Sequence, residues 1–560
     1  MDDILFKNAL VLDGSGQQGA IKDVAVCAGS IRAIGQNITQ NAKQVIDCDG
    51  LALMPGIIDS HTHFDAQITW DSTLRPSPAL GVTTAVIGNC GFTIAPCKPE
   101  HQGITMRNLT QVEGMSLQVL QSAIDWGFET FPEYLALLRS KGSVPNIAAY
   151  VGHSSVRTYV MGTDATEREA TAPEIAQMAA IVRDAMRAGA VGLASSTSPA
   201  HNGEGGKPMP SRLANDAEHM ALIEAMGAGG KGVYMVTKVG HMPVPFLEDM
   251  SAQSGRPVMI AALLHNNTNP GGVFKDLDAI AAANARGHKL IGQVSCCPLS
   301  MDFTLLSPYP VEGLQAWKPA LGQSGEALKA VLRDASFRST VRAEIAAPAS
   351  FRLFNGEWDQ LHITEAATGK YRALEQKPFG ALAASLGKDP LDLMLDTALD
   401  EDLRTVFTAM LLNSNEAAVG QMLNHPHSIV SLSDAGAHLT FFNDAGFGLH
   451  LLGHWARGLG VMPLQEAVRQ LTSVPADIFG FAKRGRIKEG YAADLLLFDP
   501  KTVGRGPKMR VNDLPGGAAR LHTDGVGVHG VWVNGQQVAD ARGLLAKPPK
   551  AGALITEFAS

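Results

Sequence analysis

The chain has 560 residues, of which 45% are hydrophobic and 58 are glycine, a composition typical of a densely packed α/β enzyme and not of a disordered or fibrous protein. The net charge of −8 argues against nucleic acid or an anionic membrane as partner. Six cysteines are too few for a disulfide framework, no apolar run is long enough to span a membrane, and the acidic N-terminus predicts no signal peptide. We therefore expect a cytoplasmic protein that acts on a small-molecule substrate, with the formation of a homo-oligomer left open.

Both ends of the chain predict short strands separated by glycine-rich turns. Strand-like patterns occur in five segments: 4–12, 23–26, 31–35, 493–498 and 528–535. Neither end has enough strands to enclose a core by itself. We therefore predict one composite β-sandwich domain, built from residues 1–54 and 485–560.

The middle of the chain, residues 55–484, repeats an apolar strand followed by a helical pattern. Eight segments are continuously apolar, as buried parallel strands are: 56–60, 83–88, 146–151, 189–194, 232–236, 258–264, 290–295 and 429–432. Helical spacing of apolar residues recurs over 171–188 and 324–332. Eight such units predict a TIM (β/α)8 barrel, whose active site lies at the C-terminal ends of the strands. The stretch 296–428 is too long for a simple crossover, so we expect it to include a helical cap over the site.

The first predicted barrel strand ends in His61 and His63. Their i, i+2 spacing places both imidazoles on one face of a strand, where they can share a metal ion. The eighth predicted strand delivers Asp434 at its end. Imidazoles and a carboxylate at strand ends are what a catalytic zinc site with an open position for water requires.

Further candidate ligands follow other predicted strands. Strand two is followed by Cys90, strand three by His153, strand five by Lys238 and His241, strand six by His265, and strand eight by His438 beyond Asp434. Any one of them could be an ordinary buried residue, and Cys90 could be a small hydrophobic core residue. So many possible ligands at strand ends together predict a metal site.

Several motifs resemble those of the amidohydrolase superfamily, in particular its N-acyl-D-amino-acid deacylase (D-aminoacylase) branch. They are His61-Thr62-His63, Gly88-Asn89-Cys90-Gly91-Phe92, Val151-Gly152-His153, and the stretch 471–476 running into 484–494. The resemblance implies one or two zinc ions, with His61 and His63 binding one of them and Cys90 binding or bridging. It further implies that His265 serves the second metal position, and that Asp434 binds metal and acts as general base on the attacking water.

The chain departs from the deacylase pattern at the fifth strand and around the substrate. Lys238 stands where the deacylases have a metal-binding histidine. Either it is carboxylated and bridges two ions, or His241 takes over, or the site holds only one metal. The groups with which deacylases hold the substrate's free carboxylate are also missing: a lysine after strand six, a tyrosine-rich motif after strand seven, and an arginine after Asp434.

These features predict a metal-dependent hydrolase of an amide bond in a bulky, largely apolar substrate. Apolar side chains near strand eight could line its binding site, although such a cluster is also common in ordinary packing: Phe441, Phe442 and Phe447. We expect three polar residues to contact the substrate, the first of them as a neutral donor to the oxyanion: His153, Arg157 and His438.

Two other interpretations stay open. A true N-acyl-D-amino-acid deacylase would need a relocated carboxylate anchor, for which Arg157 is the candidate. A non-catalytic scaffold is the second, because the superfamily includes such members. The expected ligands all remain, which argues against a scaffold: His61, His63, His265 and Asp434.

Overall fold

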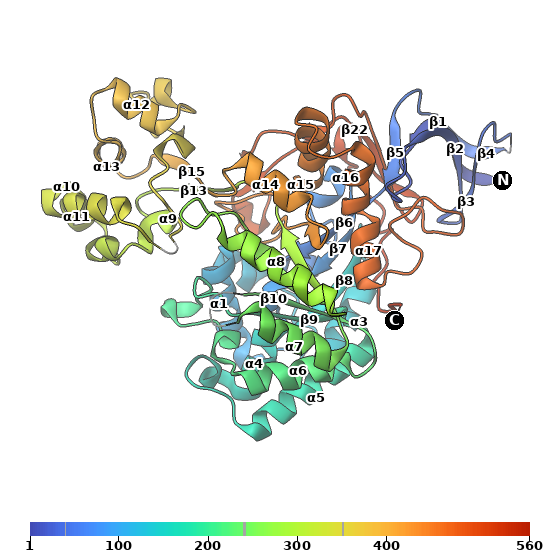
Figure 1. Ribbon diagram of the computed structural model, residues 1–560, viewed down its shortest axis with the longest axis horizontal. Coiled ribbons are helices and arrows are strands. Elements are labelled where there is room, and N and C mark those ends of the chain that lie inside the picture. Colours follow the sequence, from blue (N-terminus) through green and yellow to red (C-terminus); the bar gives the residue numbers. More distant parts are fainter. Residues whose placement is uncertain (40, 239–241, 350–351, 560) are drawn as a thin grey trace.

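The computed structural model describes residues 1–39, 41–238, 242–349 and 352–559. It consists of a barrel, a sheet that includes the N-terminal strands, and a projecting cap (Figure 1). His241, one of the alternatives for the fifth strand, lies outside the described residues. Within the described ranges, no helix is both long and apolar enough to cross a membrane.

The barrel sheet contains eight parallel strands, neighbours in this order: β6 (Ile57–Thr62), β7 (Val82–Ile87), β8 (Asn146–Gly152), β9 (Gly192–Ser196), β10 (Val233–Thr237), β11 (Val258–Leu263), β12 (Leu290–Val294) and β16 (Ser428–Val430). A parallel bridge between Thr62 and Ala435 brings the two edges of this sheet together. The strands are almost wholly buried, as expected where helices cover a parallel sheet. The predicted α/β barrel is therefore confirmed, with all eight strands at the predicted positions.

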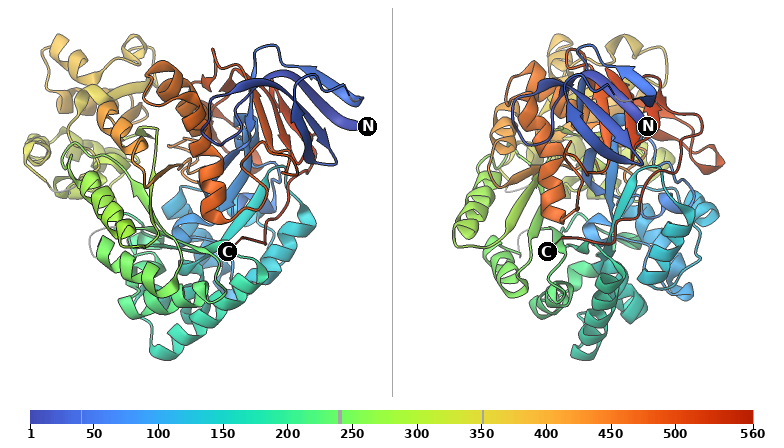
Figure 2. Two further views of the ribbon diagram at one scale, coloured as in Figure 1. Left: turned by 45° about the vertical axis from the view of Figure 1, so that its right-hand side comes forward. Right: turned by 90° about the vertical axis from the view of Figure 1, so that its right-hand side faces the viewer.

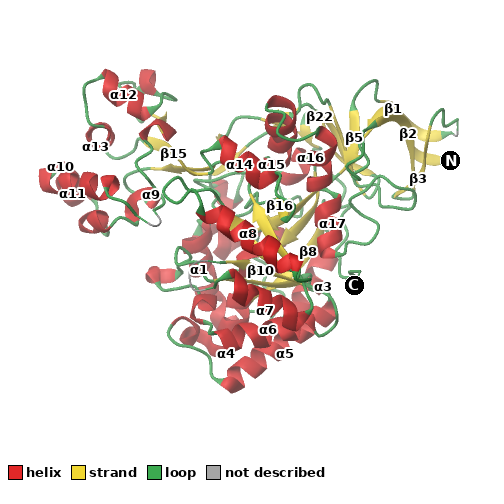
Figure 3. Cartoon of the chain, viewed as in Figure 1, coloured by secondary structure: helices red, strands yellow, loops and turns green. Residues whose placement is uncertain are grey.

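Helices surround the barrel strands (Figure 3). Between the strands lie α1 (Gln102–Glu113), α2 (Leu117–Ala123), α3 (Phe131–Lys141), α4 (His153–Met161), α5 (Ala172–Ala188), α6 (Asp216–Gly227), α7 (Val244–Ser254), α8 (Gly272–Ala285) and α14 (Glu416–Leu423), and after the last strand come α15 (Phe447–His450), α16 (Leu464–Leu471) and α17 (Ser473–Phe479). The predicted helix 171–188 is α5, whose buried face carries Met178 and Val182 and whose end is set by Gly189 at φ 108°. Glycine suits that left-handed position because it has no Cβ.

A nine-stranded sheet combines strands from both ends of the chain. It contains β1 (Asp2–Val11), β2 (Ala20–Cys27), β3 (Ser30–Gly35), β4 (Ala42–Asp47), β5 (Ala52–Pro55), β17 (Leu495–Phe498), β22 (Val528–Val533), β23 (Gln536–Asp540) and β24 (Gly543–Leu544). The two ends meet where β5 pairs antiparallel with β17 (Figure 2). Phe6 packs edge-on against Trp532, with ring centroids 4.9 Å apart. The strands of each end thus share one core, while the domain boundaries at 54 and 485 stay a prediction.

The segment between the last two barrel strands forms the cap. Its helices are α9 (Tyr309–Glu312), α10 (Gly325–Arg333), α11 (Ala335–Ala346), α12 (Phe379–Ser385) and α13 (Pro390–Asp400), and α10 is the helix predicted over 324–332. The cap also contains an antiparallel sheet that helical spacing did not indicate: β13 (Leu299–Phe303), β15 (Val406–Leu412) and β14 (Leu361–Glu365). A core of its own, with Trp317 and Phe407 fully buried, explains why it projects as a separate body in Figure 1.

Short strands after β17 reach back to the barrel mouth. They are β18 (Gly504–Arg505), β19 (Met509–Val511), β20 (Arg520–His522) and β21 (Gly525–Val526). The Leu521 amide donates to the Leu439 carbonyl at 2.7 Å, and Arg505 pairs with Asp444 at 2.7 Å. The loop that follows Asp434 is therefore held from the C-terminal part of the chain.

Candidate metal centre

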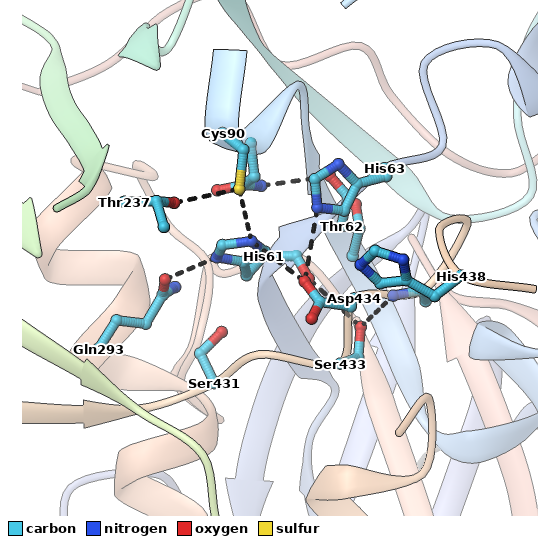
Figure 4. A network of polar contacts seen from close by, with 12 residues as sticks. His61, Thr62, His63, Cys90, Thr237, Gln293, Ser431, Ser433, Asp434 and His438 are labelled. Carbon is cyan, nitrogen blue, oxygen red and sulfur yellow. Dashed lines mark hydrogen bonds and ion pairs between the residues drawn. The ribbon is translucent and has the colours of Figure 1, made fainter. Parts of the chain in front are cut away.

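Four side chains from three strand ends converge at the mouth of the barrel (Figure 4). His61 and His63 come from β6, Cys90 from the turn after β7, and Asp434 from the loop after β16. One ligand atom from each of His61, His63 and Cys90 lies within 4.8 Å of the others. Asp434 Oδ1 lies 3.2 Å from His61 Nε2 and 3.4 Å from His63 Nε2.

The backbone at Cys90 and Asp434 is unusual. Cys90 has φ 56° and Asp434 has φ 48°, in the left-handed region that residues with a Cβ rarely adopt. Gly91 lets the Cys90 turn lie against β9, because a Cβ there would come within 2.4 Å of the Ala194 carbonyl oxygen. Ser433 donates to Asp59 Oδ2 at 2.5 Å and accepts from the Ala435 amide at 3.0 Å, which holds the Asp434 turn. Such conformations persist where the surroundings enforce them, and they cluster at functional sites.

A hydrogen bond orients His61, and an ion-pair contact lies at the corresponding nitrogen of His63. His61 Nδ1 lies 2.7 Å from the Gln293 Oε1 atom on β12, and His63 Nδ1 lies 3.1 Å from Glu113 Oε1. Because the amide oxygen accepts a hydrogen bond, Nδ1 of His61 carries the proton. Both rings then present Nε2 to Asp434, the arrangement that orients metal-bound histidines in proteins.

The donor set fits one tetrahedral ion with three protein ligands, His61, His63 and Cys90, and a fourth position beside Asp434. Bonds of about 2.0–2.3 Å to nitrogen, oxygen and sulfur hold the ligand atoms of such an ion roughly 3.3–3.8 Å apart. Asp434 Oδ1 lies 3.2 and 3.4 Å from the two imidazole nitrogens, and Cys90 Sγ lies 3.6 Å from His61 Nε2. Two imidazoles, a thiol and a carboxylate also match the ligand types that zinc accepts.

The electrostatics of the cluster favour a positive charge at its centre. Burial disfavours the charged form of His61, but Cys90 and Asp434 outweigh it and raise the pKa of His61 to about 10. Burial likewise raises the pKa of Cys90 and of Asp434, but the two histidines outweigh it, so the thiol pKa is lowered and the carboxyl pKa lies well below its usual range. A divalent cation would supply the positive charge that these anions attract.

The cluster borders a small cavity of about 90 Å³. The remaining lining residues are Phe92, Val112, Glu113, His201, Thr237, Ala262, Leu432 and His438. No lysine or arginine of the described chain is among them. A larger cavity of about 570 Å³ lies at the N-terminal ends of β11, β12 and β16, next to Pro257, Leu290 and Ser428. Barrel enzymes carry out chemistry at the other end, so the small cavity is the candidate site.

Two of the expected substrate contacts lie elsewhere. His153 and Arg157 are fully buried, and both pair with Glu218 on α6, His153 through Nε2 at 2.7 Å. His153 Nδ1 also lies 2.8 Å from Ser195 Oγ, so neither ring nitrogen is left for a substrate. His153 and Arg157 thus form a buried ion-pair network inside the barrel wall, and their contact with a substrate stays a prediction. His438, the third expected contact, does line the cavity.

Two of the expected metal ligands, Lys238 and His265, lie outside the cluster. Lys238 Nζ donates to Asp276 Oδ1 on α8 at 2.9 Å, and at this strand end Thr237 lines the cavity instead. Alternate residues of a strand point to opposite faces, so one step along β10 removes Lys238 from the cluster. His265 is buried near Phe274, and Ala262 lines the cavity from the sixth strand. Neither Lys238 nor His265 joins the cluster in this arrangement, and their binding of a metal ion stays a prediction.

Three polar residues of the site were not anticipated. Gln293 is a buried polar residue within an apolar strand, a pattern that could have indicated it. His201 follows the fourth strand, for which the sequence analysis names no site residue. Its Nδ1 lies 2.7 Å from Ser196 Oγ, which accepts from the Ser198 amide at 3.2 Å. Glu113 ends an ordinary-looking helix, and no local signal points to it.

The phenylalanines near strand eight are mostly packing residues. Phe442 and Phe447 are buried, Phe447 in the barrel core, and neither lines the cavity. Phe441 stacks on Tyr309 of the cap, with ring centroids 5.7 Å apart. The apolar surface of the cavity comes instead from Phe92, Val112 and Leu432.

Comparisons with known proteins agree with this fold. The model of the amidohydrolase family matches residues 44–288 and 348–539. A D-aminoacylase of Alcaligenes xylosoxydans xylosoxydans is 28% identical over 548 residues, covering 96% of this chain and 94% of that protein. A solved D-aminoacylase with a binuclear metal centre matches with a TM-score of 0.66 and 25% identity over the full length of both chains. An N-acyl-D-glutamate deacylase of Bordetella bronchiseptica, solved with zinc and a phosphonate inhibitor, shares the fold with a TM-score of 0.68 and 24% identity, covering 99% of this chain and all of that one.

Proposed function

This chain belongs to the amidohydrolase family, and on that premise we propose that it hydrolyses an amide bond with a zinc ion held by three residues: His61, His63 and Cys90. Asp434 lies beside the fourth position, which a catalytic zinc ion keeps open for water. The resemblance seen in the motifs is thereby confirmed at the level of the family. The observation that carries the proposal is the convergence of ligand atoms of His61, His63 and Cys90 within 4.8 Å of one another, with Asp434 Oδ1 3.2 and 3.4 Å from the two imidazole nitrogens.

Two residues have defined roles in this reaction. A bound zinc ion supplies a water nucleophile at neutral pH, because coordination lowers the pKa of water to about 7. Asp434 accepts a proton from the attacking water and passes it to the leaving nitrogen. His201 donates a hydrogen bond to the carbonyl oxygen, in the place first expected for His153. The Ser196 hydroxyl accepts from Ser198 and can donate to His201 Nδ1, which leaves the proton on Nε2.

His201 suits this role because it stays neutral at physiological pH. Burial is the main reason that its pKa is lowered to about 4. A neutral imidazole keeps a single N–H group, and the hydrogen bond with Ser196 decides which nitrogen carries it. His201 lines the same cavity as Asp434, on the side of the fourth strand.

We propose one metal ion rather than two. The solved D-aminoacylase relative has a binuclear centre. In this chain, Thr237 and Ala262 line the cavity from the fifth and sixth strands, where a second set of ligands was expected. Lys238, which would have to become a carbamate bridge, is engaged with Asp276.

The cavity favours an amide without a free carboxylate beside the bond that is cleaved. No described lysine or arginine lines it, while Glu113 and Asp434 both contribute carboxylates. A carboxylate buried without a charged partner costs several kcal/mol. The space of about 90 Å³ admits little beyond the scissile group, so the bulk of a large substrate has to lie outside it.

A second candidate is true N-acyl-D-amino-acid deacylation, which the names of the relatives favour. Its substrate would need a carboxylate anchor. Arg157 cannot serve in this conformation, because it is fully buried and paired with Glu218. The third alternative, a scaffold without catalysis, is disfavoured because all four donor groups of the cluster are retained.

A matched pair of substrates tests the proposal. N-acyl-2-phenylethylamine and N-acyl-D-phenylalanine differ only in the carboxylate, and the zinc-loaded protein should hydrolyse the neutral amide with at least ~10-fold higher kcat/KM, which corresponds to about 1.4 kcal/mol. Elemental analysis should find close to one zinc ion per chain, and chelation should abolish the activity. A preference for N-acyl-D-phenylalanine would support the deacylase instead. Turnover of both compounds that is indifferent to chelation would overturn the metal mechanism.

A further inference from the structure

Glu113 makes three contacts with the residues around the metal cluster. Its Oε1 lies 3.1 Å from His63 Nδ1, and its Oε2 lies 3.9 Å from His438 Nε2. Its backbone carbonyl accepts a hydrogen bond from the His438 amide. The last residue of α1 is thus connected both to the first barrel strand and to the loop after the eighth.

The position of this carboxylate is unfavourable by itself. Glu113 is only 2% exposed, and a buried charge needs a compensating partner. It also stands in the last turn of α1, where the helix dipole disfavours an acidic residue. Because the location costs stability, the contacts with the site have to offset it.

Gly114 lets α1 approach the site closely enough for these contacts. It caps the helix at φ 62°, and a Cβ there would come within 2.7 Å of Phe441 Cε1 and 3.6 Å of the His438 Cα. A side chain at this position would therefore have to displace the Phe441 ring or the end of α1. Glycine at this position lets the end of α1 pack close to that loop, which keeps the Glu113 carboxylate within reach of His63.

We propose that Glu113 is a positioning residue for the metal ion: it holds the proton of His63 on Nδ1, so that Nε2 is free to bind. The inference rests on the metal site proposed above. Gln293 does the same for His61 with a neutral oxygen at 2.7 Å. The two ligands of the His61-Thr62-His63 motif are thus oriented by residues from different elements, β12 for one and α1 for the other.

Zinc affinity, measured by competition with a chromophoric chelator, tests the inference without a substrate. Glu113→Ala should bind zinc roughly 10- to 100-fold more weakly than the unaltered protein, the usual effect of removing a group that orients a metal ligand. Glu113→Gln should recover most of the loss, because its amide oxygen can accept from Nδ1 as Gln293 does. Glu100→Gln removes an exposed carboxylate just before α1 and should change nothing.

Spectra of the cobalt-loaded protein provide a second measurement. The charge-transfer band of the Cys90 thiolate should persist in Glu113→Ala but shift, because the geometry of His63 changes around the same ion. If Glu113→Ala does not fold, Glu113→Asp keeps the charge but shortens the reach, and it should also bind zinc more weakly. Unchanged affinity and spectrum in a folded Glu113→Ala or Glu113→Asp protein would overturn the inference. Failure of the unaltered protein to bind zinc would instead overturn the proposed function.

Discussion

Lys238 and Asp276 form an ion pair across β10 and α8, with Nζ 2.9 Å from Oδ1 and only 12% of the lysine side chain exposed. The ammonium is therefore engaged with a carboxylate outside the metal cluster. A free ammonium beside a divalent ion would be repelled, so this pair keeps the lysine charge away from the site.

The first prediction concerns this lysine. Lys238→Met should retain zinc content and amide hydrolysis close to the unaltered protein, because Lys238 pairs with Asp276 and is not among the described residues that line the cavity. Elemental analysis and kcat/KM measure both, and Asp276→Asn is the matched control for loss of the ion pair. If Lys238→Met instead loses metal and short carboxylic acids restore activity, a carbamate bridge forms and the conformation described above is not the active one.

The second prediction concerns Asp434. Asp434→Asn should reduce turnover by ~10² or more at saturating zinc, because the asparagine side chain cannot accept the proton of the attacking water. Circular dichroism should show an intact fold, since Asp434 is at the barrel mouth and not in a core. Near-normal kcat in the zinc-loaded variant would remove Asp434 from the reaction.

The third prediction concerns the buried network of His153, Arg157 and Glu218. Burial raises the pKa of Glu218, but its contacts with His153 and Arg157 outweigh this and lower that pKa from 4.5 to about 2. A carboxyl with a lowered pKa stabilises the folded state above its unfolded pKa. This stabilisation is lost as the pH falls from about 4.5 through about 2. It amounts to about 3 kcal/mol at neutral pH.

Glu218→Gln should remove this pH dependence. Its free energy of unfolding should be about 3–5 kcal/mol lower at pH 7, because Arg157 is left buried without its partner. Between pH 4.5 and pH 2, the free energy of unfolding of Glu218→Gln should change less than that of the unaltered protein. Denaturant titrations at several pH values measure both effects, with Glu224→Gln on the exposed side of α6 as control. If the free energy of unfolding of Glu218→Gln and of Glu224→Gln fell equally with pH, other carboxyls would govern acid unfolding.

Local patterns in the sequence were enough to predict the barrel and the centre of its site. Eight continuously apolar segments became eight buried parallel strands, because such runs are stable only where both faces of a sheet are covered. His61 and His63 share one face because side chains alternate along a strand. Asp434 could be placed opposite them because all strands of a parallel barrel end at the same rim.

Tertiary structure alone decided which of the other polar residues take part. Thr237 and Lys238 are neighbours in sequence, but the register of β10 turns one into the cavity and the other toward α8. His153 follows a barrel strand as a site residue would, but α6 places the Glu218 carboxylate against its ring. Glu113 has no local signal at all, since its role comes from contacts with His63 and His438, far away in the sequence. Spacing along the chain determines the face on which a side chain lies, whereas its partner is determined only when distant elements pack together.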